Sequence, residues 1–316
     1  MPDALDIVIA GAGGMGSLFG SILQDGGHNV VLYDVDVEHI GMISAKGLKI
    51  EGFGGSRVMQ MQATTDPRQI DRADVILFQC KAHGTRSAAQ RLKPLVEGGA
   101  ICVSFQNGLG NEQIIAEEVG AENVLGGLTA MAAVKLAPGV IRDFSRVPSY
   151  IGEMQGRSSA RVEKLVTAFS NAGLETHDSA AIQDVIWKKL IGNISLSALS
   201  GLTNKTAAAC MRTPFLKTIA LQAATEALEV AAAEGISLDR DAVIAGIEMI
   251  SEPGGTGDNK SSLCEDLNHQ RPTEVEVIYG SAIAAGKAKG LSTPTLDTLY
   301  CLVRARQAEY LESEAD

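Results

Sequence analysis

The chain has 316 residues, and its 27 Lys and Arg against 38 Asp and Glu give a formal net charge of −11 at pH 7. This balance argues against a general nucleic-acid binder or a protein of anionic membrane surfaces, because both partners repel an acidic surface. With 45% hydrophobic residues, the chain is too apolar for intrinsic disorder and long enough for two domains.

The five cysteines are scattered and odd in number, and none forms a C-x-x-C motif or a Cys/His pair at metal-ligand spacing. They indicate reduced thiols and no metal site. The first six residues carry acid instead of a basic region, which argues against a signal peptide. Uncharged stretches are interrupted by Gly, Asn or Ser before they reach the roughly 20 apolar residues of a membrane span. We therefore expect a soluble, cytoplasmic protein.

Four short apolar runs in the first half alternate with segments of helical character. They are Asp6 to Ala10, Val30 to Tyr33, Val75 to Gln79 and Ile101 to Phe105. This alternation predicts a parallel sheet with helices on both faces. Glycines and alternating residues between Lys46 and Gln62 predict a small hairpin or edge excursion inserted in that sheet, and the stretch from 134 to 152 has a similar pattern.

The second half is helical in character from about His177 onward. Residues 180–202 are nearly continuous helix formers, and residues 220–234 form an alanine-rich amphipathic stretch that ends at Gly235. Pro272 and Pro294 are each placed to begin a further helix. A loop rich in Gly, Asn and Ser, residues 252–262, separates two of the helices.

A glycine motif, Gly11-Ala12-Gly13-Gly14-Met15-Gly16, follows the first strand and precedes a helical segment. In this context the first glycine permits a tight turn, the second lets a pyrophosphate approach the backbone, and the third brings helix against strand. A chance match in a glycine-rich chain is the alternative, and the flanking strand and helix argue against it. We predict an α/β fold with an N-terminal Rossmann-type doubly wound sheet, residues 1–178, and an all-helical C-terminal domain, residues 179–316.

Asp34 ends the second strand, eighteen positions after Gly16. An acid there accepts hydrogen bonds from the adenosine ribose hydroxyls and repels a 2′-phosphate. Asp34 therefore favours NAD as the cofactor, with NADP as the alternative. A turn-forming Asp at a strand end is the structural alternative.

Lys81 and Asn107 stand at the carboxyl ends of the next two strands, the edge at which open α/β sheets bind ligands. A solvated loop lysine and an Asn-Gly turn are the alternatives. Their convergence with Gly11 and Asp34 at the ends of successive strands favours a functional site.

Lys189, Asn193 and Ser197 recur every four residues in an otherwise apolar helical stretch, so they share one narrow stripe. Such a stripe is expected to face a polar interior cleft, and a surface stripe with an extended lysine is the alternative. Glu274, two residues after Pro272, lies in the first turn of the predicted helix, where the helix dipole favours any carboxylate. Asn259-Lys260-Ser261-Ser262 offers amide and hydroxyl donors for a small carboxylate.

Six segments together resemble the ketopantoate reductase family, in order and over nearly the whole chain. They are GAGGMG (11–16), CKAH (80–83), QNGLG (106–110), WKKLIGN (187–193), NKSSLCEDL (259–267) and RPTEVEVIYG (271–280). The resemblance implies a Rossmann domain and a helical domain, with the active site in the cleft between them.

The resemblance also implies roles for individual residues. Lys189 would be the catalytic general acid for a 2-keto group, and Asn193 would bind substrate. Asn107 would touch both nicotinamide and substrate, while Lys81 and Ala132 would bind the cofactor. Asn259 and Ser262 would bind the carboxylate side of the substrate. Glu274 would complete the catalytic group and bind the nicotinamide ribose or the substrate hydroxyl.

The chain departs from the family pattern at two places. Ser197 stands where the family usually has a second substrate-binding Asn, which leaves the acid open between ketopantoate and another compound. Tyr33-Asp34 replaces a common Arg near the end of the second strand, which again favours NAD.

These observations lead to the hypothesis of reversible hydride transfer between a nicotinamide and a small 2-keto or 2-hydroxy acid. The apolar helix should lower the pKa of Lys189, and Glu274 should raise it. One alternative is an NAD-dependent catabolic hydroxyacid or sugar-acid dehydrogenase on the same fold. Another is a non-catalytic dinucleotide-binding protein, against which the presence of Lys189 and Glu274 argues. The alanine-rich helical domain favours a homodimer.

Overall fold

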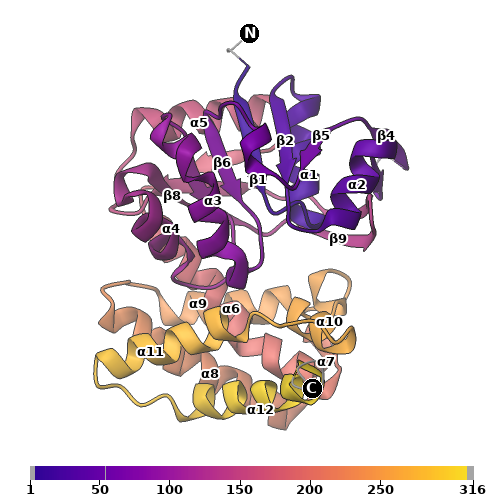
Figure 1. The fold of residues 1–316 in the computed structure, drawn as a ribbon. Helices are drawn as coiled ribbons and strands as arrows, with labels where there is room; N and C mark the ends of the chain where they lie inside the picture. Colours follow the sequence, from indigo (N-terminus) through magenta and orange to yellow (C-terminus); the bar gives the residue numbers. More distant parts are fainter. Residues whose placement is uncertain (1–3, 54, 312–316) are drawn as a thin grey trace. The chain divides into compact units, whose positions relative to one another are not determined.

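The structure is a computed structural model that describes residues 4–53 and 55–311 (Figure 1). It comprises two compact units. The first contains Met1–Gln106 and Asn111–Gln183, and the second contains Asn107–Gly110 and Asp184–Asp316. The chain therefore enters the second unit for four residues before it returns to the first.

An eight-stranded sheet forms the centre of the first unit, in the order β12-β11-β8-β7-β6-β1-β2-β5. Its strands are β1 (Asp6–Ala10), β2 (Asn29–Tyr33), β5 (Gln62–Thr64), β6 (Val75–Phe78), β7 (Ile101–Ser104), β8 (Val124–Thr129), β11 (Ser149–Glu153) and β12 (Thr176–Asp178). The four predicted strands are confirmed, with ends that differ by no more than one residue. The sheet is parallel except that β11 pairs antiparallel with β8.

Both faces of this sheet are covered by helices, as predicted. The side chains of a strand alternate between the two faces, so Ile7 and Ile9 of β1 pack with α1 (Gly14–Asp25) and α5 (Ala160–Asn171). Val8 and Ala10 point to the opposite face and pack with α3 (Thr85–Glu97) and α4 (Asn111–Val119). Burial on both faces explains why these strands are almost continuously apolar.

A second, four-stranded sheet in the order β4-β3-β10-β9 corrects one prediction. Strands β3 (Leu48–Glu51) and β4 (Arg57–Met59) do form an antiparallel hairpin, but this hairpin is not part of the large sheet. Instead, β3 pairs with β10 (Val140–Ser145), which forms its own hairpin with β9 (Ala132–Ala137). The local alternation of residues predicts the hairpin itself. It does not predict the pairing of β3 with β10, because β10 lies about 90 residues later in the chain.

The second unit is helical. Its elements are α6 (Ile182–Thr203, from Asp184 on), α7 (Ala207–Arg212), α8 (Pro214–Ala233), α9 (Arg240–Ile250), η4 (Thr256–Asp258), α10 (Ser262–Asn268), η5 (Glu276–Gly280), α11 (Ser281–Ala288) and α12 (Pro294–Leu311). Five alanines of α8 are fully buried in one apolar cluster with side chains such as Ile191 and Ile194 of α6; they are Ala220, Ala223, Ala224, Ala227 and Ala231. The predicted start at Pro294 is confirmed, whereas α8 begins six residues earlier than predicted, at Pro214.

The helix predicted to begin near Pro272 begins later. The backbone N–H and the hydroxyl of Thr273 both donate to Oε1 of Gln307 in α12. Thr273 is therefore held against α12 and lies outside the helix. Helical geometry starts at Val275 and continues as the π-helix η5 into α11.

All five cysteines are free thiols, as predicted. None of the helices within residues 4–53 and 55–311 is long and apolar enough to cross a bilayer. Among the same residues, no group of three or more His, Cys, Asp or Glu is arranged to hold a metal ion.

Candidate active site

The turn between β1 and α1 depends on two of its glycines for space. Gly11 has a φ of +105°, and a Cβ on it would lie 2.3 Å from the backbone nitrogen of Cys80. A Cβ on Gly16 would lie 1.9 Å from the carbonyl oxygen of Gly11. These contacts give Gly11 the turn-forming role and Gly16 the close helix–strand approach that the motif predicts.

Gly13 differs, because a Cβ built on it meets no described atom within 4 Å. Gly13 is the N-cap of α1. The first turn of this helix, all of whose residues the structure describes, carries no acidic side chain. Its neighbour Gly14 lies against β9, where a Cβ would be 2.7 Å from the carbonyl oxygen of Ala133. A bare helix N-terminus with open space beside it is suited to a phosphate, so these residues fit a dinucleotide.

Asp34 binds the glycine turn directly. Its Oδ2 accepts a hydrogen bond from the N–H of Ala12 at 2.7 Å, and its Oδ1 accepts one from the N–H of Asp36 at 3.0 Å. The second bond is the turn-forming interaction considered as the structural alternative. The half-buried carboxylate therefore stabilises a turn at the end of β2 and also lies next to the phosphate-binding motif.

Lys81 follows β6 and precedes a short turn, η2 (Ala82–Gly84). Gln106 holds this loop, because its Nε2 donates to the carbonyl oxygen of Cys80 at 2.8 Å and to Oγ1 of Thr85 at 2.7 Å. Gln106 was not predicted as a functional residue. Its position at the end of a parallel strand is the only sequence signal for this role. Ala132, the remaining predicted cofactor residue of this unit, is exposed at the start of β9.

Within the second unit, the structure brings Lys189 and Asn107 together. Lys189 Nζ donates a hydrogen bond to Asn107 Oδ1 at 2.8 Å. The segment 107–110 is fixed against η5, because the N–H of Leu109 donates to the carbonyl oxygen of Val277 at 3.0 Å. Gly108, with a φ of +87°, permits this approach, since a Cβ on it would lie 2.4 Å from the same oxygen.

The electrostatic surroundings of Lys189 agree with the prediction. Burial lowers the pKa of its ammonium to about 8, and the carboxylate of Glu274 acts in the opposite direction by raising it. Glu274 itself is half-buried and lies just before the helical turn, where its carbonyl oxygen accepts from the N–H of Ile278. The prediction that Glu274 lies inside the first turn was wrong by one residue, because the helix starts at Val275.

The other residues of the predicted stripe also lie on α6. Asn193 is half-buried and Ser197 is buried, so the stripe is not an ordinary surface stripe. The hydroxyl of Ser261 donates to the carbonyl oxygen of Ser197 at 3.1 Å, which brings the segment 259–262 to the same helix. Asn259 and Ser262 of this segment are exposed.

Ser261 belongs to the predicted donor segment 259–262, but the sequence did not predict its individual role. It is the N-cap of α10, where its hydroxyl accepts from the N–H of Cys264. A serine directly before a helix is a recognisable capping signal. That signal predicts a helix start but not the bond to α6.

Comparisons with known proteins agree with this arrangement. The family model described as ketopantoate reductase PanE/ApbA matches residues 7–156, and the model of the C-terminal part of the same family matches residues 181–307. A 2-dehydropantoate 2-reductase of Halobacterium salinarum is 33% identical, over 96% of this chain and 99% of that protein. One from Pyrococcus abyssi is 31% identical, over 96% and 98%.

Solved structures show the same fold. D-mandelate dehydrogenase with NADH and anilino(oxo)acetate has a TM-score of 0.92 at 29% identity, covering 97% of this chain and 99% of that one. A PanE/ApbA family ketopantoate reductase from Ralstonia eutropha JMP134 has a TM-score of 0.89 at 28% identity, with the same coverage.

Proposed function

Because the chain belongs to the ketopantoate reductase family and is an NAD(P)-dependent oxidoreductase acting on a CH–OH group, we propose that it interconverts a small 2-keto acid and the corresponding 2-hydroxy acid. The first candidate substrate is 2-dehydropantoate, on which the named relatives act. Because the chain is an oxidoreductase of this family, the alternative of a non-catalytic dinucleotide-binding protein is excluded.

The observation that carries the proposal is the pairing of Lys189 with Asn107. The bond from Nζ to the amide oxygen orients the ammonium without neutralising its charge, since an amide carries none. A pKa of about 8 leaves the amine mostly protonated at neutral pH, yet close enough to give up its proton. These are the properties that a general acid for a carbonyl oxygen requires.

In the proposed mechanism, Lys189 donates a proton in reduction and accepts one in oxidation. A nicotinamide cofactor held at the glycine turn would supply the hydride chemistry at the carbonyl carbon. As negative charge develops on the carbonyl oxygen, Lys189 Nζ transfers a proton to it, so the C=O bond becomes CH–OH. In oxidation the neutral amine accepts the hydroxyl proton. Glu274 keeps part of the lysine population protonated by raising its pKa.

The remaining residues are proposed to bind and orient. Asn107 and Asn193 would contact the reacting end of the substrate, together with Ser197. Asn259 and Ser262 would donate to its carboxylate. Glu274 would also bind the nicotinamide ribose or the substrate hydroxyl, and Lys81 and Ala132 would bind the cofactor beside the glycine turn.

We further propose NAD as the preferred cofactor. The carboxylate of Asp34 is held beside the glycine turn by the N–H groups of Ala12 and Asp36. In this position it can accept from ribose hydroxyls, and its charge opposes a 2′-phosphate. A cytoplasmic location and a homodimer stay predictions.

A second candidate is an NAD-dependent hydroxyacid dehydrogenase. The likeness to D-mandelate dehydrogenase with NADH favours it, as do Asp34 and the replacement of an expected Asn by Ser197. In that case the preferred acid would carry a larger or less polar group than pantoate.

A substrate panel tests both candidates. We would measure kcat/KM for 2-dehydropantoate with NADH and with NADPH, and for D-mandelate and related 2-hydroxy acids with NAD and with NADP. Preference for 2-dehydropantoate supports the first candidate, and preference for another acid with NAD supports the second. Absence of cofactor turnover with every 2-keto and 2-hydroxy acid in the panel would contradict the proposed substrate class.

A further inference from the structure

Asn204 is the first residue after α6 and has a left-handed backbone, with a φ of +56°. Glycine adopts this conformation without a steric penalty and is the usual residue at such helix ends, with Asn as the second choice. Asn204 has a side chain that glycine lacks, and that side chain makes specific contacts.

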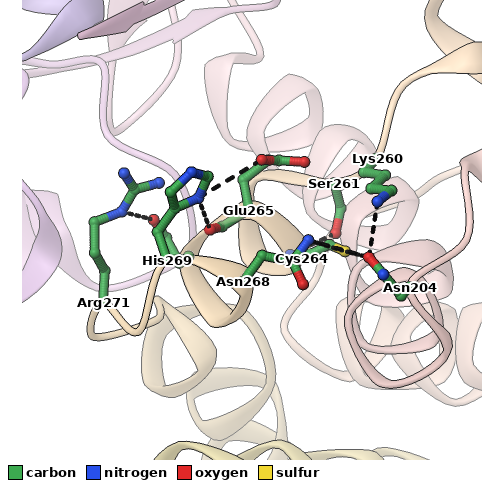
Figure 2. A network of polar contacts seen from close by, with 9 residues as sticks. Asn204, Lys260, Ser261, Cys264, Glu265, Asn268, His269 and Arg271 are labelled. Carbon is green, nitrogen blue, oxygen red and sulfur yellow. Dashed lines mark hydrogen bonds and ion pairs between the residues drawn. The ribbon is translucent and has the colours of Figure 1, made fainter. Parts of the chain in front are cut away.

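The side-chain oxygen of Asn204 accepts hydrogen bonds from one short stretch of the chain (Figure 2). Lys260 Nζ donates to Oδ1 at 2.8 Å and Asn268 Nδ2 donates at 3.1 Å, while Cys264 Sγ lies at 3.5 Å. An amide oxygen has two lone pairs, so the bonds from Lys260 and Asn268 are the principal ones. The bond from Lys260 is charge-assisted and therefore the stronger of the two. Asn204 thus attaches the segment just before α10, at Lys260, and the last residue of α10, Asn268, to the end of α6.

A second attachment lies one residue further along the same stretch. The hydroxyl of Ser261 donates to the carbonyl oxygen of Ser197, and its N–H donates to Oγ of Ser200 at 3.1 Å. Ser261 is therefore hydrogen-bonded to α6, and Lys260 is hydrogen-bonded to Asn204 directly after α6. The two residues that flank them, Asn259 and Ser262, are exposed and are the candidate ligands of the substrate carboxylate.

We propose that Asn204 is a positioning residue that holds Asn259 and Ser262 in place for the substrate carboxylate. This inference rests on the proposed function, because it needs an acid substrate bound by this segment. The physical basis is preorganisation: donors that are already fixed lose less freedom on binding the carboxylate. Losing the acceptor of Lys260 would weaken substrate binding more than the proton transfer at Lys189.

Two substitutions at this position separate the side chain from the backbone. Asn204→Gly keeps the left-handed conformation and deletes the acceptor, whereas Asn204→Asp keeps an oxygen acceptor for Lys260 and Asn268. With 2-dehydropantoate and NADH or NADPH, we expect Asn204→Gly to raise KM about tenfold, with kcat changed less than about threefold. Asn204→Asp should keep KM close to that of the wild type. An unchanged KM in Asn204→Gly, or equal loss in both variants, would overturn the proposal.

Amide hydrogen exchange gives a measurement that does not depend on turnover. The N–H groups of Ser261 and Cys264 are both hydrogen-bonded, so peptides covering residues 259–264 should exchange about tenfold faster in Asn204→Gly. Arg157→Gly is the matched control, because it also replaces a left-handed non-glycine residue, with a φ of +77°, in the first unit. Equal exchange in the wild type and Asn204→Gly would contradict the anchoring role.

The two experiments also keep this proposal apart from the proposed function. A wild-type protein that turns over no 2-keto acid contradicts the proposed function and, with it, the carboxylate role of Asn259 and Ser262. A wild-type protein that is active, with an Asn204→Gly variant of unchanged KM, contradicts only the positioning role.

Discussion

Lys189 Nζ donates a 2.8 Å hydrogen bond to Asn107 Oδ1, a residue 82 positions earlier in the chain. The amide fixes the direction of the ammonium, and burial lowers the pKa of the lysine to about 8. Orientation comes from the loop after β7, and the lowered pKa comes from the surroundings of α6. Both properties belong to the same nitrogen, which makes Lys189 the residue whose removal is most informative.

Replacing Lys189 by Ala should reduce kcat by about 10²-fold or more, because the proton donor for the carbonyl oxygen is lost. The measurement is steady-state turnover with the best acid of the panel. Lys188→Ala is the matched control, since this neighbouring lysine is exposed and should leave turnover nearly unchanged. Nearly normal turnover in Lys189→Ala would remove it from the mechanism.

The pH dependence of kcat/KM should show the titration of Lys189. Reduction needs the protonated amine, so its kcat/KM should fall as the pH rises through about 8. Oxidation needs the neutral amine, so its kcat/KM should rise over the same range.

Glu274→Gln should move this titration to lower pH. The carboxylate of Glu274 raises the pKa of Lys189, whereas burial lowers it. The neutral Gln removes the first effect, so the pKa of Lys189 should fall further. The pH profiles of the wild type and the variant provide the measurement. A profile that stays at the same pH, or moves upward, would contradict the electrostatic role of Glu274.

Two glycine substitutions in the same turn should have different effects, one on stability and the other on nucleotide affinity. Gly16→Ala places a Cβ 1.9 Å from the carbonyl oxygen of Gly11 and should lower the free energy of unfolding by at least about 2 kcal/mol. Gly13→Ala meets no described atom, so the protein should keep its stability and lose nucleotide affinity by steric exclusion. Urea unfolding and nucleotide titration measure the two effects. A Gly13→Ala variant with normal affinity would contradict the assignment of the pyrophosphate site.

Asp34→Asn should shift cofactor preference toward NADP(H) by about tenfold, because it removes the charge opposed to a 2′-phosphate. The amide oxygen of the variant can still accept from the N–H of Ala12, which limits damage to the glycine turn. The ratio of kcat/KM for NADH and NADPH is the measurement, with thermal unfolding as the control. An unaltered ratio in a stable variant would exclude Asp34 as the discriminating residue.

The fold was predictable where one segment carries its own signal. β1 runs from Asp6 to Ala10, as predicted, because a strand buried on both faces is a continuous apolar run that ends at a glycine turn. The pairing of β3 with β10 was not predictable, because it joins segments about 90 residues apart and the local pattern of each is complete without the other.

The candidate site divides in the same way. The spacing of Lys189, Asn193 and Ser197 predicts one helical stripe, and strand ends predict Asn107 and Lys81. Gln106 and Asn204 act through hydrogen bonds to Cys80 and Lys260, and the second of these pairs is separated by 56 residues. No periodicity in the sequence encodes such pairs.

The short excursion of Asn107–Gly110 into the helical unit affects how this protein can be divided or recombined. A cut at a single peptide bond cannot yield two complete modules, because the helical fragment would have its lysine without the amide that orients it. A chimera made by exchanging only residues 184–316 with a relative would combine a lysine from one parent with an asparagine loop from the other. Exchange of intact catalytic groups between relatives therefore needs two crossovers around residues 107–110 as well as one near residue 184.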